Sequence, residues 1–262
     1  MLFTIYINAV MEPRTISEVV TAIDDIVQYC QQHRNRAGYF AALYKRMTMA
    51  VAEGIAAGAF ENGPRMEQLD VVFAQRYLSA WHAYQQQGEC TNSWKYAFDG
   101  CLNQSLTVLQ QLVLGINTHI NLDLAIAAAT VAPGAGIHAL QHDFNRINEV
   151  ITSLIDDVQQ CLEQVWFPMR WLKRVAATQQ TDVLDFSIGA ARKAAWANAV
   201  LLANMRPQQQ QLHIRAMDAT VHSLGRKIIN PGLWSKALLQ AVRATEYEDV
   251  ARTIRLIDTT VV

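Results

Sequence analysis

Apolar and polar residues follow one another along most of this chain with the period of an α-helix. Apolar positions recur at spacings of three and four residues, which gathers them on one face of a helix. Gly, Pro and Asn residues separate the periodic runs. Alternation typical of a β-strand is confined to residues 2–7. The pattern therefore predicts an all-α protein with helices over residues 15–32, 36–59, 64–87, 92–130, 143–165, 169–177, 182–205, 208–229, 233–244 and 247–258.

One predicted helix differs from the others because part of it is apolar on nearly every side. This part covers residues 106–128 of the predicted helix 92–130, and such a pattern indicates a buried central helix. We expect the helix to be continuous, with a bend near Gly100 or Gly115. The loop Pro133–Gly136 then lets the next helix fold back antiparallel to it.

The domain organisation follows from what the chain lacks. No Gly/Ser/Pro-rich linker and no internal repeat divides its 262 residues. We expect one all-α domain over residues 1–262, with residues 1–14 as an N-terminal extension. It should be a single bundle of about eight to ten helices packed around the central buried helix.

Composition narrows the classes of partner. Hydrophobic residues make up 51% of the chain and charged residues 17%, with a formal net charge of −1. No Lys/Arg cluster of the kind that binds a phosphate backbone is present, which argues against a nucleic-acid partner. No apolar run reaches the roughly 18–20 residues that cross a bilayer, so we expect no transmembrane segment. The low charge suits buried interfaces and leaves a homo-oligomer open.

Cysteine usage and the N-terminus favour a cytoplasmic protein. The four cysteines are Cys30, Cys90, Cys101 and Cys161, and they form neither a C-x-x-C pair nor a zinc-site spacing. The N-terminal residues lack the basic leader of a signal peptide. We therefore expect free thiols in a reducing cytoplasm.

Two polar residues four positions apart interrupt the apolar central helix. His119 and Asp123 share a face because an α-helix turns once in 3.6 residues. Burying an imidazole and a carboxylate costs free energy unless each finds a partner. Three interpretations are open: a hydrogen bond between the two inside the core, a metal site, or a substrate site without metal.

A metal site would need a third ligand. His119 and Asp123 offer one nitrogen and one oxygen to a divalent ion such as Zn²⁺ or Fe²⁺. Asp143, which follows His142 at the start of the next predicted helix, is the nearest further candidate. The alternative for Asp143 is an N-cap, a position that Asp favours. We expect His119, Asp123 and Asp143 to converge as catalytic or metal-ligating residues.

Further polar residues lie on apolar stripes of other predicted helices. Asp70 and Tyr77 share a face of the helix 64–87, and Arg76 lies at its edge. Arg192 and Trp196 stand four apart in an alanine-rich helix. We interpret these residues as substrate-binding candidates, because the planar guanidinium group suits a carboxylate. The alternatives are an Arg–Asp pair that joins helices and a structural cation–π contact.

These motifs together resemble those of an uncharacterised bacterial family of helical domains of unknown function. Its signature G-[IM]-N-x-H-I-x-x-D-L is matched by residues 115–124, and the likeness extends over about residues 44–200. The other matching segments are Met66–Tyr77, Asp143–Val150 and Ala191–Trp196. The resemblance implies a shared fold and a shared polar centre, and it brings no established activity.

The function remains a choice among three classes. The chain has no G-x-G-x-x-G, Walker, G-x-S-x-G or H-E-x-x-H motif. The leading hypothesis is an enzyme acting on a small apolar or aromatic molecule, as a metal-dependent hydrolase or lyase if an ion binds. Without a metal, His119 and Asp123 would act in acid–base catalysis. The alternatives are a non-catalytic helical protein that binds a hydrophobic ligand, and a structural or oligomeric scaffold.

Overall fold

Every element in the described part of the chain is helical, which confirms the all-α prediction. A computed structural model describes residues 12–147 and 188–259. In chain order the elements are α1 (Ile16–Gln32), α2 (Gly38–Ala56), α3 (Gly63–Gln85), α4 (Asn92–Leu102), α5 (Val108–Thr118), the π-helical turn η1 (His119–Asp123), α6 (Leu124–Val131), the 3₁₀ turn η2 (Gly134–Gly136), α9 (Ile188–Ala203), α10 (Pro207–Ile229), α11 (Leu233–Arg243) and α12 (Val250–Thr259). Residues 137–147 are helical as well.

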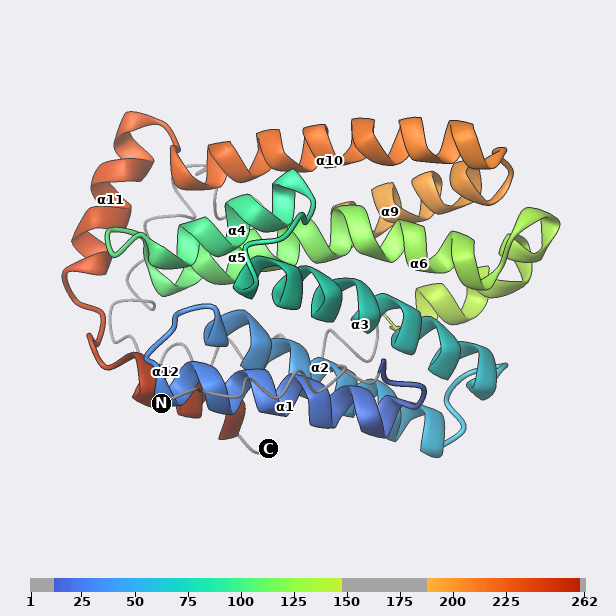
Figure 1. Cartoon of the computed structure of the whole chain (residues 1–262), viewed down its shortest axis with the longest axis horizontal. Coiled ribbons are helices and arrows are strands. Elements are labelled where there is room, and N and C mark those ends of the chain that lie inside the picture. The colour runs from blue at the N-terminus through green and yellow to red at the C-terminus, as the bar shows by residue number, and fades with distance from the viewer. Residues whose placement is uncertain (1–11, 148–187, 260–262) are drawn as a thin grey trace, which may run out of the picture.

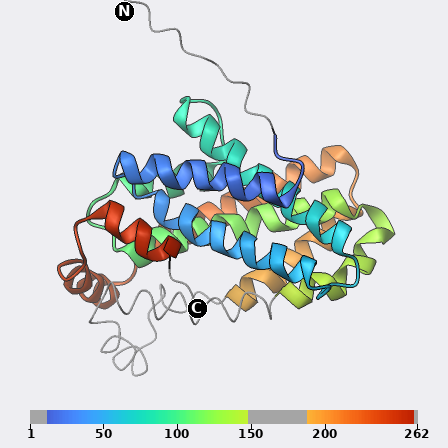
Figure 2. The same ribbon diagram turned by 90° about the horizontal axis from the view of Figure 1, so that it is seen from below.

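The helices stack in layers around one central rod (Figure 1). The rod is formed by α5, η1 and α6, which run on without interruption. It packs against α9 and α10 on one side and against α2, α3 and α4 on the others. Helices α1, α2 and α12 lie side by side at the edge of the bundle opposite α10 (Figures 1 and 2). The expected central helix is thus present, and it brings residues from five neighbouring helices together.

Burial explains why the central rod is so apolar. The stretch Val108–Val131 is the one described segment long and apolar enough to cross a membrane by length and composition. Of its most apolar window, 89% is buried inside the bundle. Such a helix meets the same test when it forms the core of a helical bundle.

The structure divides the predicted helix 92–130 into two. Residues Asn103–Thr107 are not helical, and a new helix begins at Val108 with Thr107 as its N-cap. The Thr107 hydroxyl accepts a hydrogen bond from the Gln110 backbone N–H, and the Gln110 side chain accepts one from the Thr107 N–H, both at 3.1 Å. This capping box starts α5. Apolar periodicity alone had favoured one continuous helix, and that prediction was wrong.

One turn of the rod is wider than an α-helical turn. Across η1 the Leu124 N–H donates to the His119 carbonyl, five residues back instead of four. A π-helical turn of this kind is rare and occurs frequently at functional sites. It contains both polar residues that the sequence analysis selected in the central helix, His119 and Asp123.

Three helices have their N-termini capped by buried acids from distant parts of the chain. Backbone N–H groups at a helix start lack partners within the helix and favour negative charge. Each acid accepts a hydrogen bond from at least one such group at 2.7–3.1 Å: Asp143 from Glu61 and Asn62, Asp218 from Asn92 and Ser93, and Glu246 from Val108. These acids therefore fix α3, α4 and α5 relative to other elements.

This arrangement corrects the N-cap alternative for Asp143 and the predicted start of its helix at residue 143. The helix that contains it begins at residue 137, so Asp143 lies inside that helix and is not its N-cap.

Some predictions fall on residues that the structure does not describe. The predicted helix 169–177 and the predicted strand-like residues 2–7 lie outside the described residues, as does Cys161. Cys30, Cys90 and Cys101 are free thiols, as expected.

Candidate functional site

Asp123 is the centre of a hydrogen-bond cluster made only of side chains. Its Oδ1 accepts from Arg76 Nε at 2.9 Å, and its Oδ2 accepts from Trp94 Nε1 at 2.8 Å. His119 Nδ1 lies 3.2 Å from the same Oδ2. The partners come from α3, α4 and η1. Asp123 is fully buried, so these bonds provide the compensation that a buried carboxylate requires.

The cluster fixes the state of His119. A carboxylate can only accept, so the proton of the neutral ring sits on Nδ1 and leaves Nε2 with a free lone pair. Burial lowers the pKa of His119, and the nearby Asp123 offsets this effect only in part. Nε2 is buried and has no hydrogen-bond partner among the described residues. His119 therefore combines a neutral ring, a fixed tautomer and an unused basic nitrogen.

Five aromatic rings surround His119. Phe73 is stacked on the imidazole with ring centres 3.6 Å apart, and Tyr44 meets it edge-on at 4.4 Å. The other three rings lie at 5.7–6.1 Å and belong to Phe40, Tyr77 and Trp94. His119 is 2% exposed, whereas the stacked ring of Phe73 is half-buried. Phe73 is the ring of this group that lies nearest to solvent.

The same region holds further buried polar atoms without partners. Within the described residues these include Tyr77 Oη and Asp70 Oδ2, and the neighbouring hydroxyl groups of Tyr44 and Thr48 have no partner besides each other. Burial raises the pKa of Asp70 to about 7, and it raises the pKa of Tyr44, with a smaller contribution from Asp70, well above its ordinary value. Unsatisfied buried polar atoms are rare, and they often mark a bound water, ion or ligand. With His119 Nε2 they form what we call the inner polar group: Tyr44, Asp70, Tyr77 and His119.

A pocket of about 390 Å³ opens beside this cluster. Arg76 and Trp94 line it, and both donate to Asp123. Its other walls come from α3, from the segment before α4, from α6 and from residue 12. Asp123 therefore does not line the pocket itself but contacts two of the side chains that do.

The sequence-based candidates divide between two places. The structure brings Arg76 and Asp123 together with His119, as expected, and it places Tyr77 in the ring of aromatic residues. Asp70 is a buried acid of the inner polar group. The expected convergence with Asp143 is wrong, because its two oxygens bind Glu61, Asn62 and Arg65 at the start of α3.

Arg192 and Trp196 form a separate contact on α9. Arg192 Nη2 donates to the Phe144 carbonyl at 2.7 Å, and its guanidinium carbon lies 4.7 Å from the Phe144 ring centre. The Trp196 ring is 4.8 Å from the same ring. Burial lowers the pKa of Arg192 to about 10. This is the structural cation–π alternative considered for Arg192, and it joins α9 to the helical residues 137–147.

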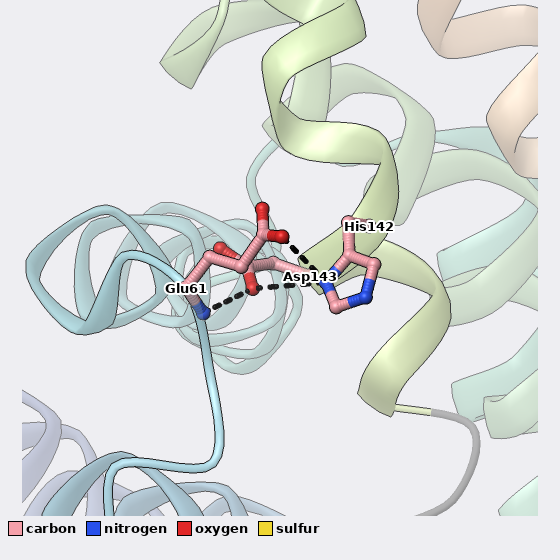
Figure 3. Close-up of side chains that lie close together, drawn as sticks. All are labelled: Glu61, His142 and Asp143. Atoms are coloured by element: carbon pink, nitrogen blue, oxygen red, sulfur yellow. Dashed lines mark hydrogen bonds and ion pairs between the residues drawn. The ribbon is translucent and has the colours of Figure 1, made fainter.

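One group of potential metal ligands is present in the described residues, and it is not the predicted one. Glu61, His142 and Asp143 lie together (Figure 3). His142 Nδ1 is 3.4 Å from Glu61 Oε1 and 4.0 Å from Asp143 Oδ1. The Arg65 guanidinium, 2.9 Å from Asp143, and two backbone N–H groups already use both Asp143 oxygens. The helix-capping role explains Asp143 without an ion.

The Asp123 cluster also fits a metal ion poorly. Both carboxylate oxygens already accept hydrogen bonds, and the Arg76 cation lies 2.9 Å away. An ion that bound Asp123 would have to displace Arg76 or Trp94 and would be repelled by the guanidinium charge. The residues at this centre suit acid–base chemistry better than metal coordination.

Comparison with known proteins gives the chain a family. A family model described as a family of unknown function, DUF5995, matches residues 16–231. The chain belongs to this family. The match includes α1 to α10 and therefore contains the whole Asp123 cluster. No curated protein and no solved structure matches the chain.

Sequence reasoning missed Trp94 and the aromatic enclosure. Trp94 lies on an apolar face near the start of the predicted helix 92–130, where a tryptophan is expected in the core whatever its indole N–H does. Phe40 and Tyr44 lie on the apolar stripe of the predicted helix 36–59, where aromatic residues are expected simply to fill the core. The signal that could have found them is the excess of aromatic residues on the faces that α2, α3 and α4 turn toward one another.

Proposed function

We propose that the protein is an enzyme that acts on a small molecule by acid–base chemistry at His119. In this proposal His119 Nε2 is the general base, Asp123 orients the imidazole, and Arg76 positions the substrate. The observation that carries it is the bonding of Asp123, which accepts only from side chains. Three other buried acids, Asp143, Asp218 and Glu246, instead bind backbone N–H groups of a helix start.

The chemistry of the pair supports this assignment. A general base works best when it is neutral at the working pH and has its lone pair free. His119 meets both requirements, because its pKa is lowered and Nε2 has no partner among the described residues. A carboxylate on the other ring nitrogen stabilises the imidazolium that forms when the ring accepts a proton. Reactions open to such a pair include hydrolysis and elimination.

Access to Nε2 is the step on which catalysis depends. The substrate would enter by the pocket whose wall contains Arg76 and Trp94. Phe73 is the half-buried ring that covers the imidazole, and its rotation would open a path to the inner polar group. Opening of this kind occurs in many enzymes that exclude water from the reaction.

Carbethoxylation tests this access without knowledge of the substrate. Diethyl pyrocarbonate modifies neutral imidazoles, and peptide mass mapping would follow each histidine over time in the folded protein. We expect rapid modification of the exposed His33 and slow but measurable modification of His119. Phe73→Ala should accelerate modification of His119 at least tenfold. Phe60→Ala, which removes a ring from another part of the core, is the matched control and should not accelerate it.

A second candidate function is non-catalytic binding of a small molecule. His119 is 2% exposed and surrounded by five rings. This enclosure favours a binding function, because it keeps a substrate away from Nε2. If His119 stays unmodified in both the wild type and Phe73→Ala as long as they are folded, the imidazole is sealed and the enzyme proposal is wrong. In an activity screen with ester, amide and phosphoester substrates, the enzyme proposal requires a loss of about 10²–10⁴-fold in His119→Asn.

A further inference from the structure

The pocket beside Arg76 has features that select a class of ligand. We infer that it binds a small zwitterion of the α-amino acid kind, with a carboxylate at Arg76, an ammonium group at Glu12 and Glu89, and an apolar side chain against the remaining wall. This inference deepens the proposed function and rests on it only in taking the ligand as the substrate. Binding itself does not require that His119 be catalytic.

Arg76 supplies the anion-binding end. Its Nε is held by Asp123 at 2.9 Å, and its two terminal nitrogens make no hydrogen bond to any described residue. The side chain is 30% exposed and lines the pocket. A guanidinium group fixed at one edge presents its remaining N–H groups in a planar fork, which matches the two oxygens of a carboxylate. Because Asp123 holds the side chain in place, little conformational entropy is lost on binding.

Glu12 and Glu89 supply the cation-binding groups. Both are exposed, both line the pocket, and neither forms an ion pair with another described residue. The charges of Arg76 and Asp123 cancel, so the two glutamates leave the site negative overall. A simple anion would be repelled by this site, and a simple cation would leave Arg76 without a partner. A molecule with both charges satisfies both ends.

The remaining wall and the size fit a single metabolite. Val72, Ile126 and Trp94 contribute apolar surface to the pocket. Its volume of about 390 Å³ lies near the lower end of the range of roughly 300–1,000 Å³ for small-molecule sites. The pocket therefore has room and apolar surface for the side chain of the ligand.

Matched chemical probes test the inference. Each of a set of free α-amino acids with apolar side chains would be titrated into the full chain by calorimetry, beside its N-acetyl derivative and its amide. The N-acetyl derivative retains the carboxylate and loses the ammonium group, whereas the amide does the reverse. We expect saturable binding of at least one free amino acid, and binding at least tenfold weaker for both of its derivatives.

Variants assign the two ends of the ligand. Arg76→Met should weaken binding of the free amino acid at least tenfold, and Arg76→Lys, which keeps the charge but loses the planar fork, should weaken it in the same direction. Glu12→Gln and Glu89→Gln, both at exposed positions, should reduce the preference for the free amino acid over its N-acetyl derivative. Arg255→Met and Glu53→Gln, exposed and outside the pocket, are the matched controls and should bind as the wild type does.

Three outcomes would overturn the inference: no saturable binding of any free amino acid at millimolar concentration, equal affinity for the N-acetyl derivative, or unchanged affinity in both Arg76 variants. Its failure and that of the proposed function are distinguishable. Amino acid binding with a sealed His119 would retain the inference and reject the enzyme. Reactive His119 without amino acid binding would do the opposite.

Discussion

At the scale of single residues, the buried acids differ in what compensates them. Asp143 and Asp218 accept from backbone N–H groups, whereas Asp123 accepts from Arg76, Trp94 and His119. Asp70 has one oxygen with no partner among the described residues. Burial penalises the ionised form of an acid in that position. Asp70 should therefore dominate the pH dependence of this region.

Asp70→Asn should remove a pH-dependent loss of stability. Burial, with a smaller contribution from Glu67, raises the pKa of Asp70 from 3.8 to about 7. Between these values the folded protein keeps a proton that the unfolded chain has released, so the free energy of unfolding falls as pH rises. Above about pH 7 the loss is complete. Relative to the wild type, Asp70→Asn should gain about 2–3 kcal/mol between pH 5 and pH 8.

Urea denaturation at the two pH values measures this gain. Asp25→Asn, at an exposed position, is the control and should follow the wild type at both. A difference between Asp70→Asn and the wild type that stays constant with pH would contradict the raised pKa of Asp70.

The residue pattern predicted part of this centre and could not predict the rest. His119 and Asp123 were found because a spacing of four places two side chains on one helix face. Arg76 and Asp70 were found because charged residues on apolar stripes are unusual. Asp143 was misplaced because the sequence does not reveal which neighbouring helix a carboxylate will face. In this helix it faces α3 and not the central rod.

At the scale of elements, helix starts are the points where distant parts of the chain are joined. The period of apolar residues predicted α1, α3 and α10 to within about three residues at each end. It did not predict the break before Thr107 or the wide turn η1, because both are set by local hydrogen bonds that leave the apolar pattern unchanged. The pattern of apolar residues likewise does not predict which acids from other elements cap these helix starts.

Asp143→Asn should destabilise the fold without any involvement of metal. The variant loses the charge that Arg65 and two backbone N–H groups of the α3 start share. Truncating one side of such a buried pair costs about 3 kcal/mol in the free energy of unfolding, which urea denaturation would measure. Zn²⁺ or a chelator should leave the stability of the wild type unchanged. Stabilisation of the wild type by Zn²⁺, absent in the variant, would instead indicate an ion at Glu61, His142 and Asp143.

At the scale of the whole molecule, the apolar core has two parts. One part joins α1, α2, α4 and α5, and the other joins α6, α9 and residues 137–147. Met47, Phe73 and Ile116 pack against both parts. The central rod crosses from one to the other at η1, so His119 lies at their border. Close approach of α2 and α5 on one side of this border depends on Gly115.

Gly115→Ala should test how tightly the border is packed. A Cβ at this position would lie 2.5 Å from Cγ of Phe40, whose ring helps to enclose His119. Overpacking of this kind costs about 1–3 kcal/mol, less the gain of up to about 1 kcal/mol in helix propensity. Thermal or urea denaturation should show net destabilisation. Gly136→Ala is the control, because an added Cβ there meets no atom within 4 Å. It should change the free energy of unfolding by less than about 0.5 kcal/mol. Equal effects of the two substitutions would refute tight packing at Gly115.

The position of the wide turn between the two core parts has a mechanical consequence. Met47, Phe73 and Ile116 pack against both core parts there, so a change in the packing of one part is transmitted to the other at this turn. A ligand bound against Arg76 would touch α3, α4 and the rod at once, and it would link the two core parts through Trp94 of one and Ile126 of the other.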